Sequence, residues 1–453
     1  MKTYTYFTLL IFGLLLAVVG CKKLDLPSKQ SVVIPKTLQD FQGLMDNSDQ
    51  MNNNYPVLGE IGADSYYLEQ STYDNLFTPQ HKAAYTWKKD LFSGLTLEPD
   101  WDYSFNKVFY ANVVLDGLKD IQIDNLNTND YNNVKGQALF HRAIMFYSVA
   151  QEFCKQYVAS SAKNDLGVPL RLSSDLNIKS VRASLEDAYQ QVISDLKEAI
   201  ALLPNSAKYK SRPSKAAAYA LLARVYLQMG NYGDALLNSE ASLKLYNSLI
   251  DYNSLDATAA FPIPKLGAEE IFHAEFVTQI FFPNSAIIMP KLYDSYSEND
   301  LRKTILFQPL SAGKYTFKGN YNSNGILYFA GIATDEIYLI NAECKARKGD
   351  VSGAMDELNA LLITRYKTGL FVPLTASNTE EALKFIIQER EKELLFRGVR
   401  WSDLKRLNLE PAFAVNQSRT INGTTVTLPA NDSRYTYQIP GYVITLSGIQ
   451  QNN

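Results

Sequence analysis

The chain has 453 residues, of which 44 are Lys or Arg and 47 are Asp or Glu, so its formal net charge is -3. This near balance leaves no basic surface that would bind a polyanion, and the sequence therefore predicts no nucleic-acid partner. A chain of this length can bury a large core without disulfide bonds, so its three cysteines need not be paired.

The N-terminus has the pattern of a lipoprotein leader. The apolar run "FTLLIFGLLLAVV" is shorter than the roughly 20 residues that a membrane-spanning helix needs, and it is typical of a secretory signal. The run leads into Gly20 and Cys21 and resembles the lipobox of bacterial lipoproteins, where the leader is cut before a cysteine whose thiol takes up diacylglycerol. We expect residues 1–20 to be a signal peptide and Cys21 to carry the lipid. A buried structural cysteine after an ordinary signal is the alternative.

Residues 21–56 are expected to form the lipidated N-terminus and a polar tether, with a short helical pattern in "TLQDFQGLMDN". The other cysteines, Cys154 and Cys344, lie in amphipathic runs without a C-x-x-C partner. Two buried thiols are the favoured interpretation, and a disulfide between them is the alternative.

Helical periodicity dominates the chain from about residue 101 to 249, after a stretch from 59 to 100 that indicates loops around short elements. The apolar spacing predicts helices over residues 101–121, 131–154 and 184–204. Ser184 is the expected N-cap of the third helix, with Asp187 three residues later, and Pro204 follows its end.

Two segments have the spacing of a tetratricopeptide repeat, in which two antiparallel helices pack closely. The first is "AYALLARVYLQMGNYGDALLNSEASLKLY", where Gly230 permits the tight turn between the helices. A weaker copy is "EIYLINAECKARKGDVSGAMDELNALLITRY", with Gly349 in the same role. Because residues 250–330 separate the copies and indicate loops with short strands, the repeats do not form one uninterrupted array.

The predicted fold class is therefore all-α. Tetratricopeptide-like helix pairs form a scaffold that carries irregular, aromatic-rich loop insertions and a few short strands. The expected regions are a helical one over 57–250, a loop-rich insertion over 251–330, and a C-terminal region over 331–453.

Catalytic and metal-binding motifs give no positive signal, so we expect a protein that is not an enzyme and has no cofactor. The three histidines, His81, His141 and His273, fit no metal-ligand spacing, and no nucleophile elbow, Walker loop or G-x-G-x-x-G motif is present. "DSYSEND" faintly resembles a calcium loop, but it lacks the glycine and the distal glutamate and is interpreted as a solvated turn. Paired carboxylates for glycoside hydrolysis are defined by their separation in space, which the sequence leaves open.

Residues 388–408, "QEREKELLFRGVRWSDLKRLN", carry charges of alternating sign at helical spacing. They are interpreted as a salt-bridged helix pair in which Leu394, Phe396, Trp401 and Leu404 pack inward, rather than as a ligand site.

The same stretch resembles the C-terminal signature of the SusD/RagB family of Bacteroidetes outer-membrane lipoproteins. Further resemblances follow in order along the chain: "VFYANVVLDGL", "ALFHRAIMFYSVAQEF" before "GVPLRL", "PSKAAAYALLARVYLQMGNYGDAL", "DLRK" and "EIYLINAECKARKGD". The C-terminus keeps Ile439-Pro440 and Gln451-Asn452 of the family pattern but loses its acidic residue and its "NP".

The resemblance implies a helical fold with an irregular, aromatic-bearing region above it. It also implies a lipid-anchored protein of the outer membrane that faces the cell exterior and delivers an oligosaccharide to a SusC-like TonB-dependent transporter. The outward orientation is an expectation of its own, because Lys22 and Lys23 follow Cys21 where outward-facing members often have acidic residues.

Sugar rings stack on aromatic side chains and form hydrogen bonds with amides and carboxylates, so aromatic residues in loops are the candidate ligand contacts. No family motif fixes these contacts. The candidates from two loop segments are Tyr66, Tyr67, Tyr73, Asp74, Asn75, Tyr293 and Tyr296. For each tyrosine the competing interpretation is packing of the loop against the scaffold, and Trp87 and Trp101 are assigned to the core.

Two other functions are compatible with the sequence. One is a receptor for peptide uptake. The other is a protein-binding adaptor at the outer membrane, which would need an open concave helical groove lined by Asn and Arg, whereas exposed loop tyrosines would favour the nutrient receptor.

Overall fold

The computed structural model describes residues 35–276 and 285–452. Contacts divide the chain into a short unit, Met1–Thr37, and a large compact unit, Leu38–Asn453. Only residues 35–37 of the short unit are described, and the rest of this section concerns the large unit. Cys21 and the predicted leader lie outside the described residues.

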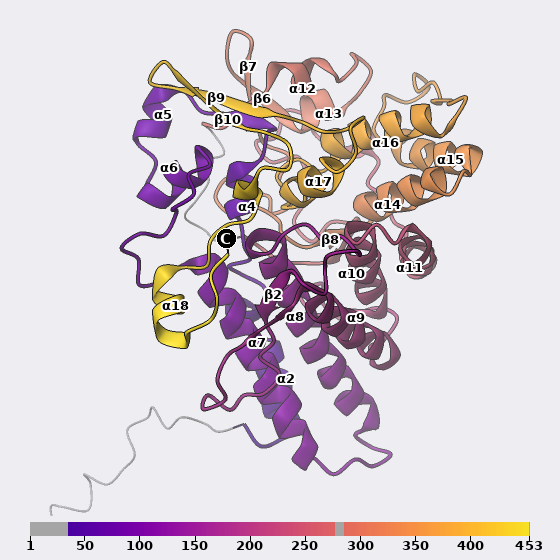
Figure 1. The fold of residues 1–453 in the computed structure, drawn as a ribbon. Coiled ribbons are helices and arrows are strands. Elements are labelled where there is room, and N and C mark those ends of the chain that lie inside the picture. Colours follow the sequence, from indigo (N-terminus) through magenta and orange to yellow (C-terminus); the bar gives the residue numbers. More distant parts are fainter. Residues whose placement is uncertain (1–34, 277–284, 453) are drawn as a thin grey trace, which may run out of the picture. The chain divides into compact units, whose positions relative to one another are not determined.

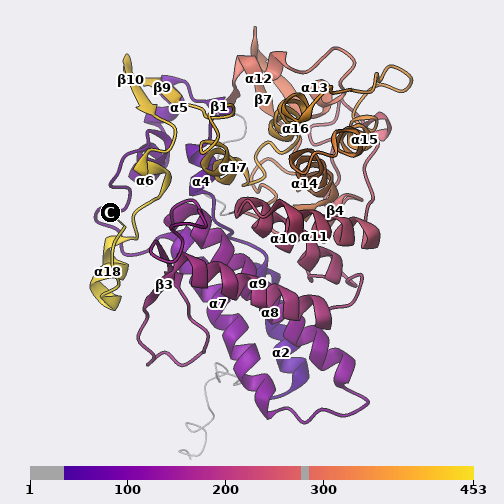
Figure 2. The same ribbon diagram turned by 45° about the vertical axis from the view of Figure 1, so that its right-hand side comes forward.

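The scaffold is a series of helices in which each packs against the next (Figures 1 and 2). The packing runs from α7 through α8, α9, α10 and α11 to α14, which contacts both α15 and α16. The bounds are α7 (Pro99–Gly117), α8 (Thr128–Phe153), α9 (Leu185–Leu202), α10 (Lys215–Gln228), α11 (Tyr232–Leu245), α14 (Thr334–Arg347), α15 (Val351–Leu362) and α16 (Thr379–Glu393). The predicted helices and both predicted repeats are confirmed.

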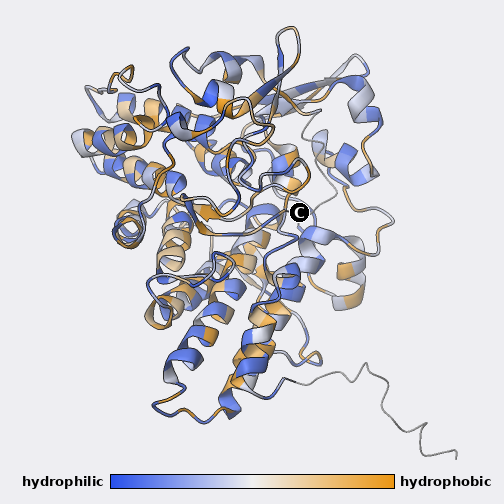
Figure 3. Cartoon of the chain, turned by 180° about the vertical axis from the view of Figure 1, so that it is seen from behind, coloured by the Kyte–Doolittle hydropathy of each residue, from blue (hydrophilic) through white to orange (hydrophobic). Residues whose placement is uncertain are grey.

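Local sequence signals set several of these helix ends. The Ser184 hydroxyl accepts a hydrogen bond from the backbone N–H of Asp187 at 3.0 Å, which is the predicted N-cap of α9. Gly230 and Gly349 have φ angles of +73° and +87°, so both repeats turn through the left-handed conformation that glycine adopts at no steric cost. Figure 3 shows the resulting amphipathic helices, with hydrophobic and hydrophilic residues on different parts of their surfaces.

Short helices precede the series. They are α2 (Leu38–Met45), α3 (Ser48–Met51), α4 (Leu58–Gly62), α5 (Gln70–Asp74) and α6 (Pro79–Tyr85). Helix α2 packs against α7 and α8, where Phe41 and Met45 join a small buried cluster. The boundary expected at residue 56 therefore lies within the large folded unit.

The strands are short. One antiparallel sheet has the order β1-β5-β7-β6, formed by β1 (Tyr66–Tyr67), β5 (Ile287–Ile288), β7 (Lys314–Phe317) and β6 (Phe307–Ser311). Three two-stranded pairs are β2 (Leu166–Pro169) with β3 (Arg182–Ser184), β4 (Glu270–Phe272) with β8 (Ile332–Ala333), and β9 (Gln417–Ile421) with β10 (Thr424–Leu428).

The remaining helices are α12 (Pro290–Asp294), α13 (Arg302–Ile305), α17 (Arg400–Leu407) and α18 (Gly441–Ser447). Short 3-10 turns span Leu118–Asp120, Tyr252–Ser254 and Ser433–Tyr435.

The core confirms the assignments made for single residues. Trp87 and Trp101 are buried, and Cys154 and Cys344 are buried free thiols. Across residues 35–276 and 285–452, no helix is both long enough and apolar enough to cross a membrane. The predicted all-α scaffold with irregular insertions and a few short strands is confirmed.

Candidate functional site

The four-stranded sheet joins the two loop segments that carry the predicted ligand contacts. Tyr66 and Tyr67 pair with Ile288 and Ile287 of β5, and Ile287 pairs with Thr316 of β7. Strand β1 therefore lies two inter-strand spacings from β7, or about 10 Å. We call the side chains carried by β1, β7 and the helices α5 and α12 beside them the aromatic platform: Tyr67, Tyr73, Asp74, Asn75, Tyr293 and Tyr315. Because Tyr67 is in register with Ile287 and Thr316, it faces the opposite side of the sheet from Tyr315.

One end of the platform is a stacked tyrosine pair. The rings of Tyr293, on α12, and Tyr315, on β7, lie with centroids 3.6 Å apart and planes inclined by 11°. Phe307 of β6 packs edge-on against Tyr293 at 5.5 Å, and Lys303 Nζ lies 5.4 Å from the centre of the Tyr293 ring. Burial, together with Tyr315, raises the pKa of Tyr293, so its hydroxyl stays protonated at neutral pH. Both rings are half-buried and are held firmly in place.

The other end lies beyond β1, on helix α5. The Tyr73 ring packs 5.8 Å from that of Tyr85, while Asp74 and Asn75 are exposed at the C-terminal end of the helix. The Gln70 amide donates a hydrogen bond to the Asp74 carboxylate at 2.7 Å, and the Asn75 amide donates one to the backbone at 2.8 Å. These short contacts orient an amide and a carboxylate beside an aromatic ring.

Two of the predicted contact residues are inside the protein instead. Tyr66 is 2% exposed and donates its hydroxyl hydrogen bond to the Ile61 carbonyl at 2.9 Å. Tyr296 is 1% exposed and donates to the Lys392 carbonyl at 2.7 Å. Their rings pack against other side chains, so the packing interpretation holds for these two tyrosines.

The hairpin of β9 and β10 completes this region, although none of its residues was predicted to contribute. Arg419 of β9 lies over the rings of Tyr85 and Trp87, 3.8 Å and 4.6 Å from their centres. Its guanidinium donates to the backbone carbonyls of Ile61, Ala63 and Tyr85. At the hairpin turn, the N–H of Asn422 donates to the Gln70 side chain at 2.6 Å. Asn422 and the glycine after it both have positive φ, and this Asn-Gly pair was the signal that would have predicted the hairpin.

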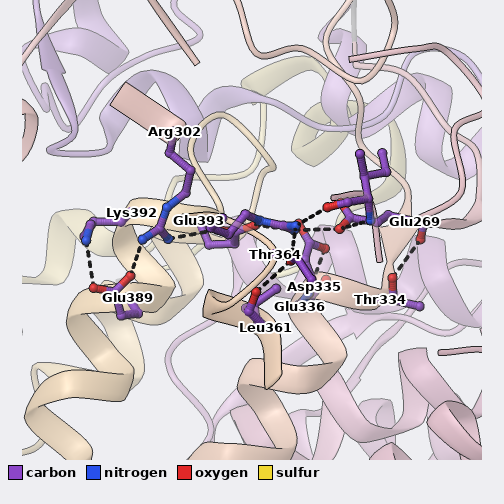
Figure 4. A network of polar contacts seen from close by, with 12 residues as sticks. Glu269, Arg302, Thr334, Asp335, Glu336, Leu361, Thr364, Glu389, Lys392 and Glu393 are labelled. Carbon is purple, nitrogen blue, oxygen red and sulfur yellow. Dashed lines mark hydrogen bonds and ion pairs between the residues drawn. The ribbon is translucent and has the colours of Figure 1, made fainter. Parts of the chain in front are cut away.

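A buried network of charges fastens the insertion carrying α12 and α13 to the C-terminal helices (Figure 4). Arg302 is fully buried and donates to Asp300, Glu389 and Glu393 at 2.6–2.9 Å. Arg365 donates to Glu393 at 2.7 Å and to Glu269 at 2.6 Å, which continues the chain of alternating charges.

Asp300 was interpreted as part of a solvated turn, and that interpretation is wrong for this residue. Asp294 and Glu298 of the same stretch are exposed, but Asp300 is buried against Arg302. Burial alone would raise the pKa of Asp300, yet Arg302 and Lys392 hold it below its ordinary value. The carboxylate therefore contributes to the packing of the insertion.

The alternating charges of residues 388–408 form the predicted salt-bridged helix pair. The Arg390 guanidinium of α16 donates to Asp403 of α17 at 2.7 Å, and the four apolar residues Leu394, Phe396, Trp401 and Leu404 are buried. Two arginines have partners that are distant in sequence. Arg397 donates to Asp335 at 2.8 Å, and Arg400 donates to Asp64 at 2.7 Å.

The chemistry that the platform offers is noncovalent. It presents tyrosine faces, a carboxylate and an amide, which together can stack on a ring and bond to hydroxyl groups. In the described part of the chain, no group of three or more His, Cys, Asp or Glu residues is arranged to hold a metal ion.

Comparisons with known proteins agree with this architecture. Residues 22–227 match a SusD-like family described as "Starch-binding associating with outer membrane", and residues 332–442 match the SusD family. The SusD-like protein P2 of Formosa agariphila is 25% identical over 346 residues, which cover 63% of this chain and 67% of that protein.

Solved structures share the fold. A SusD superfamily protein from Bacteroides thetaiotaomicron superposes with a TM-score of 0.73 at 21% identity, covering 92% of this chain and all of the other. A SusD-like carbohydrate binding protein from Bacteroides vulgatus gives a TM-score of 0.68 at 18% identity, covering 91% of this chain and 97% of the other. Since two SusD families match separate parts of the sequence and the whole described fold agrees with them, the chain belongs to the SusD/RagB family.

Proposed function

We propose that this protein is a nutrient receptor that binds an oligosaccharide on the aromatic platform without cleaving it. The observation that carries the proposal is the sheet that joins β1 to β7, because it gathers two loop segments from distant parts of the sequence. A matching family described as starch-binding and a similar structure described as a carbohydrate binding protein support the same ligand class.

The physical basis is the match between sugar rings and the platform. The C–H face of a pyranose stacks on an aromatic ring, and its hydroxyls accept and donate hydrogen bonds. Tyr293 and Tyr315 supply ring surface at one end, while Tyr73, Asp74 and Asn75 supply a ring and polar groups at the other. A few stacked rings on a wet surface give modest affinity, with a Kd from about micromolar to millimolar.

The six platform residues do not include the pair of acids that glycoside hydrolysis uses; the exposed acids beside them are Glu69, which pairs with Lys314, and Asp294. Asp74 is the only carboxylate among its six residues, whereas a glycosidase needs two carboxyl groups on either side of the scissile bond. Its tyrosines and its amide bind a sugar but do not supply a general acid paired with a base. We therefore assign the platform to capture and not to cleavage.

Membrane attachment and delivery are parts of the same proposal. A lipid on Cys21 would hold the protein at the outer membrane, facing the cell exterior, where it would pass its ligand to a SusC-like TonB-dependent transporter. The leader and Gly20-Cys21 support the anchor, and the family description "associating with outer membrane" supports the location.

The adaptor alternative needs an open helical groove with free Asn and Arg side chains. Between α10, α11 and α14, one arginine and one asparagine are already engaged in contacts between helices. Arg224 of α10 donates to Glu336 of α14 at 2.7 Å, and Asn341 of α14 donates to Ser239 at 3.0 Å. These contacts fill the spaces between helices, so they favour the receptor over the adaptor.

A panel of linear hexasaccharides with different linkages tests the proposal. The full chain, purified in a sugar-free detergent, is titrated calorimetrically with each glycan, and the recovered glycan is analysed by chromatography. We expect at least one glycan to bind and to be recovered intact. Shortened products would contradict the non-enzymatic assignment, and binding of peptides but of no glycan would favour peptide uptake.

A further inference from the structure

A second groove lies on a different part of the large unit from the platform. It has a volume of about 1100 Å³ and is bounded by α7, by the loop between β2 and β3, and by α18. Figures 1 and 2 show α18 and that loop beside α7, whereas β6, β7 and α12 lie at the other end of the scaffold. No residue of the aromatic platform lines this groove.

The floor of the groove is aromatic. Phe105 and Phe109 are half-buried and lie four residues apart on α7, so their rings follow one another along the groove at about 6 Å of helical rise. Trp101 packs beneath Phe105 with ring centroids 4.8 Å apart, which fixes the first ring in place. Asn106 lies between the two phenylalanines in sequence; it is exposed, and its amide makes no hydrogen bond to another described residue.

The wall formed by α18 is held by specific contacts. The Tyr442 hydroxyl donates to the Asp102 carboxylate on α7, and the same carboxylate accepts the N–H of Glu98 at 2.7 Å. The segment 439–451, which contains α18, begins and ends at one point: the Gln451 amide accepts a hydrogen bond from the Ile439 N–H at 2.8 Å and donates one to the Ile439 carbonyl at 2.7 Å. None of the residues of α18 is buried, so the helix stands as a wall and not as part of the core.

The opposite wall, the loop between β2 and β3, is fastened to α7 as well. The Asn112 amide donates to the carbonyl of Arg171 at 2.7 Å, and the Asp116 carboxylate accepts the N–H of Ser174 at 2.8 Å. The Arg171 guanidinium then donates to carbonyls of its own loop, including that of Asp175 at 2.8 Å. Both walls are thus built by polar contacts, and the groove is preformed.

We infer that this groove is a second oligosaccharide-binding site, separate from the platform; the inference rests on the proposed function. Two consecutive ring faces along a trough suit a linear chain of pyranoses, whose C–H faces stack in succession. The free Asn106 amide and the exposed Lys179 ammonium are placed to bond with sugar hydroxyls. A protein segment is the competing occupant, because Leu176 and Leu446 at the rim are 76% and 84% exposed.

A reporter at the rim separates the two sites. Leu446→Cys places a reactive thiol beside the groove, while Cys154 and Cys344 are buried and do not compete for an environment-sensitive dye. The same labelling of the chain without Leu446→Cys measures, and corrects for, any dye taken up by Cys21. The labelled full chain, in sugar-free detergent, is titrated with the hexasaccharide panel and, separately, with a set of short peptides. We expect a saturable dye response that persists when the platform is weakened by Tyr293→Ala.

The groove variants decide the outcome. Phe109→Ala and Asn106→Ala should each raise the Kd measured from the dye response about tenfold. Leu126→Ala is the control, because Leu126 is 93% exposed at the end of the loop after α7, and it should leave this Kd unchanged. Thermal unfolding checks that the variants fold. Asn106→Ala, at an exposed position, keeps the test valid if Phe109→Ala does not fold.

Calorimetric binding without a dye response would overturn the groove site and leave the proposed function standing. No binding by either method would overturn both, and a dye response to peptides alone would assign the groove to a protein segment.

Discussion

Arg400 forms a two-point ion pair with Asp64, in which Nε and Nη2 donate to the two carboxylate oxygens at 2.7 and 2.8 Å. The pair joins α17, near the C-terminus, to the residues that lead into β1. Both side chains are largely buried, so the contact fixes the segment on which the platform begins. The arginine motif of this family member therefore serves the architecture of the site.

Replacing Arg400 with alanine should destabilise the fold without removing ligand contacts. Asp64 would be left without its main partner, which costs about 1–4 kcal/mol of unfolding free energy. Chemical denaturation measures the loss, and glycan titration below the melting temperature should give the wild-type Kd.

Lys384→Ala is the matched control, because Lys384 pairs with Glu380 on the exposed face of α16 and its removal should leave the free energy of unfolding nearly unchanged. If Arg400→Ala kept its stability but lost ligand binding, the structural role assigned to Arg400 would be wrong.

The buried network predicts a larger effect at Arg302. Arg302→Ala would leave Asp300, Glu389 and Glu393 without a shared cation, and should cost about 3–5 kcal/mol. Its neighbour Lys303 forms an ion pair with Glu298, whose side chain is 90% exposed, and lies at the edge of the protein over the Tyr293 ring, so Lys303→Ala should lower the free energy of unfolding far less than Arg302→Ala. Equal melting temperatures for the two variants would contradict the role of the network.

A cluster of carboxyl groups at the start of α7 predicts a pH dependence of stability. Burial raises the pKa of Glu98 from an ordinary value near 4.5 to about 9, and the negative charges of Asp100 and Asp102 add to this rise. Below about pH 4.5 both the folded and the unfolded chain hold this proton. As the pH rises towards 9, only the unfolded chain releases it, so the folded state loses stability over that range.

Glu98→Gln removes this penalty while keeping an oxygen that can accept the hydrogen bond from Asp100 N–H at the helix start. The variant should match the wild type at pH 4 and exceed it by about 1–3 kcal/mol at pH 9, as measured by denaturation at each pH. Asp100 and Lys107 are present in both proteins. Burial and Asp100 raise the pKa of Glu152 and Glu98 adds to this, so removing Glu98 also lessens the loss of stability from Glu152 at high pH, in the same direction as the expected difference. A constant difference across the range would refute the assignment.

The local parts of the fold were predictable because their causes are local. Ser184 caps α9, and Gly230 and Gly349 turn the repeats, through interactions within a few residues. The site was only partly predictable. Two adjacent tyrosines in β1 have different environments, since Tyr66 is buried and Tyr67 is half-buried, and pairing with β5 decides this.

Long-range partners could not be read from spacing. Arg400, in the charged stretch 388–408, does pair with the nearby Glu391 at 3.5 Å, but its closer partner, Asp64 at 2.7 Å, lies near the other end of the chain. Asp300 looked like a member of an exposed turn because the α16 residues that bury it and its neighbour Arg302 come from a distant segment: Lys392 contacts Asp300 at 3.3 Å, and Glu389 and Glu393 contact Arg302. Such pairs are chosen by the packing of whole elements, which a one-dimensional pattern does not contain.

The lipid anchor predicts a clear change in localisation. Cys21→Ala removes the sulfur that would carry diacylglycerol, so palmitate labelling and recovery in the membrane fraction should both be lost. Unchanged labelling and membrane recovery would refute the anchor. Protease treatment of intact cells tests orientation separately, and protection of the wild type would refute only the outward-facing placement.

The most direct test of the central claim is glycan binding by two neighbouring tyrosine variants, measured by calorimetry with a hexasaccharide that binds the wild type. Tyr293→Ala removes half of the stacked pair and should weaken binding by about tenfold or more. Tyr296→Phe deletes only the buried hydroxyl that bonds to Lys392, so its Kd should equal that of the wild type even if its melting temperature falls. Equal binding by Tyr293→Ala and the wild type would contradict the platform as the ligand site.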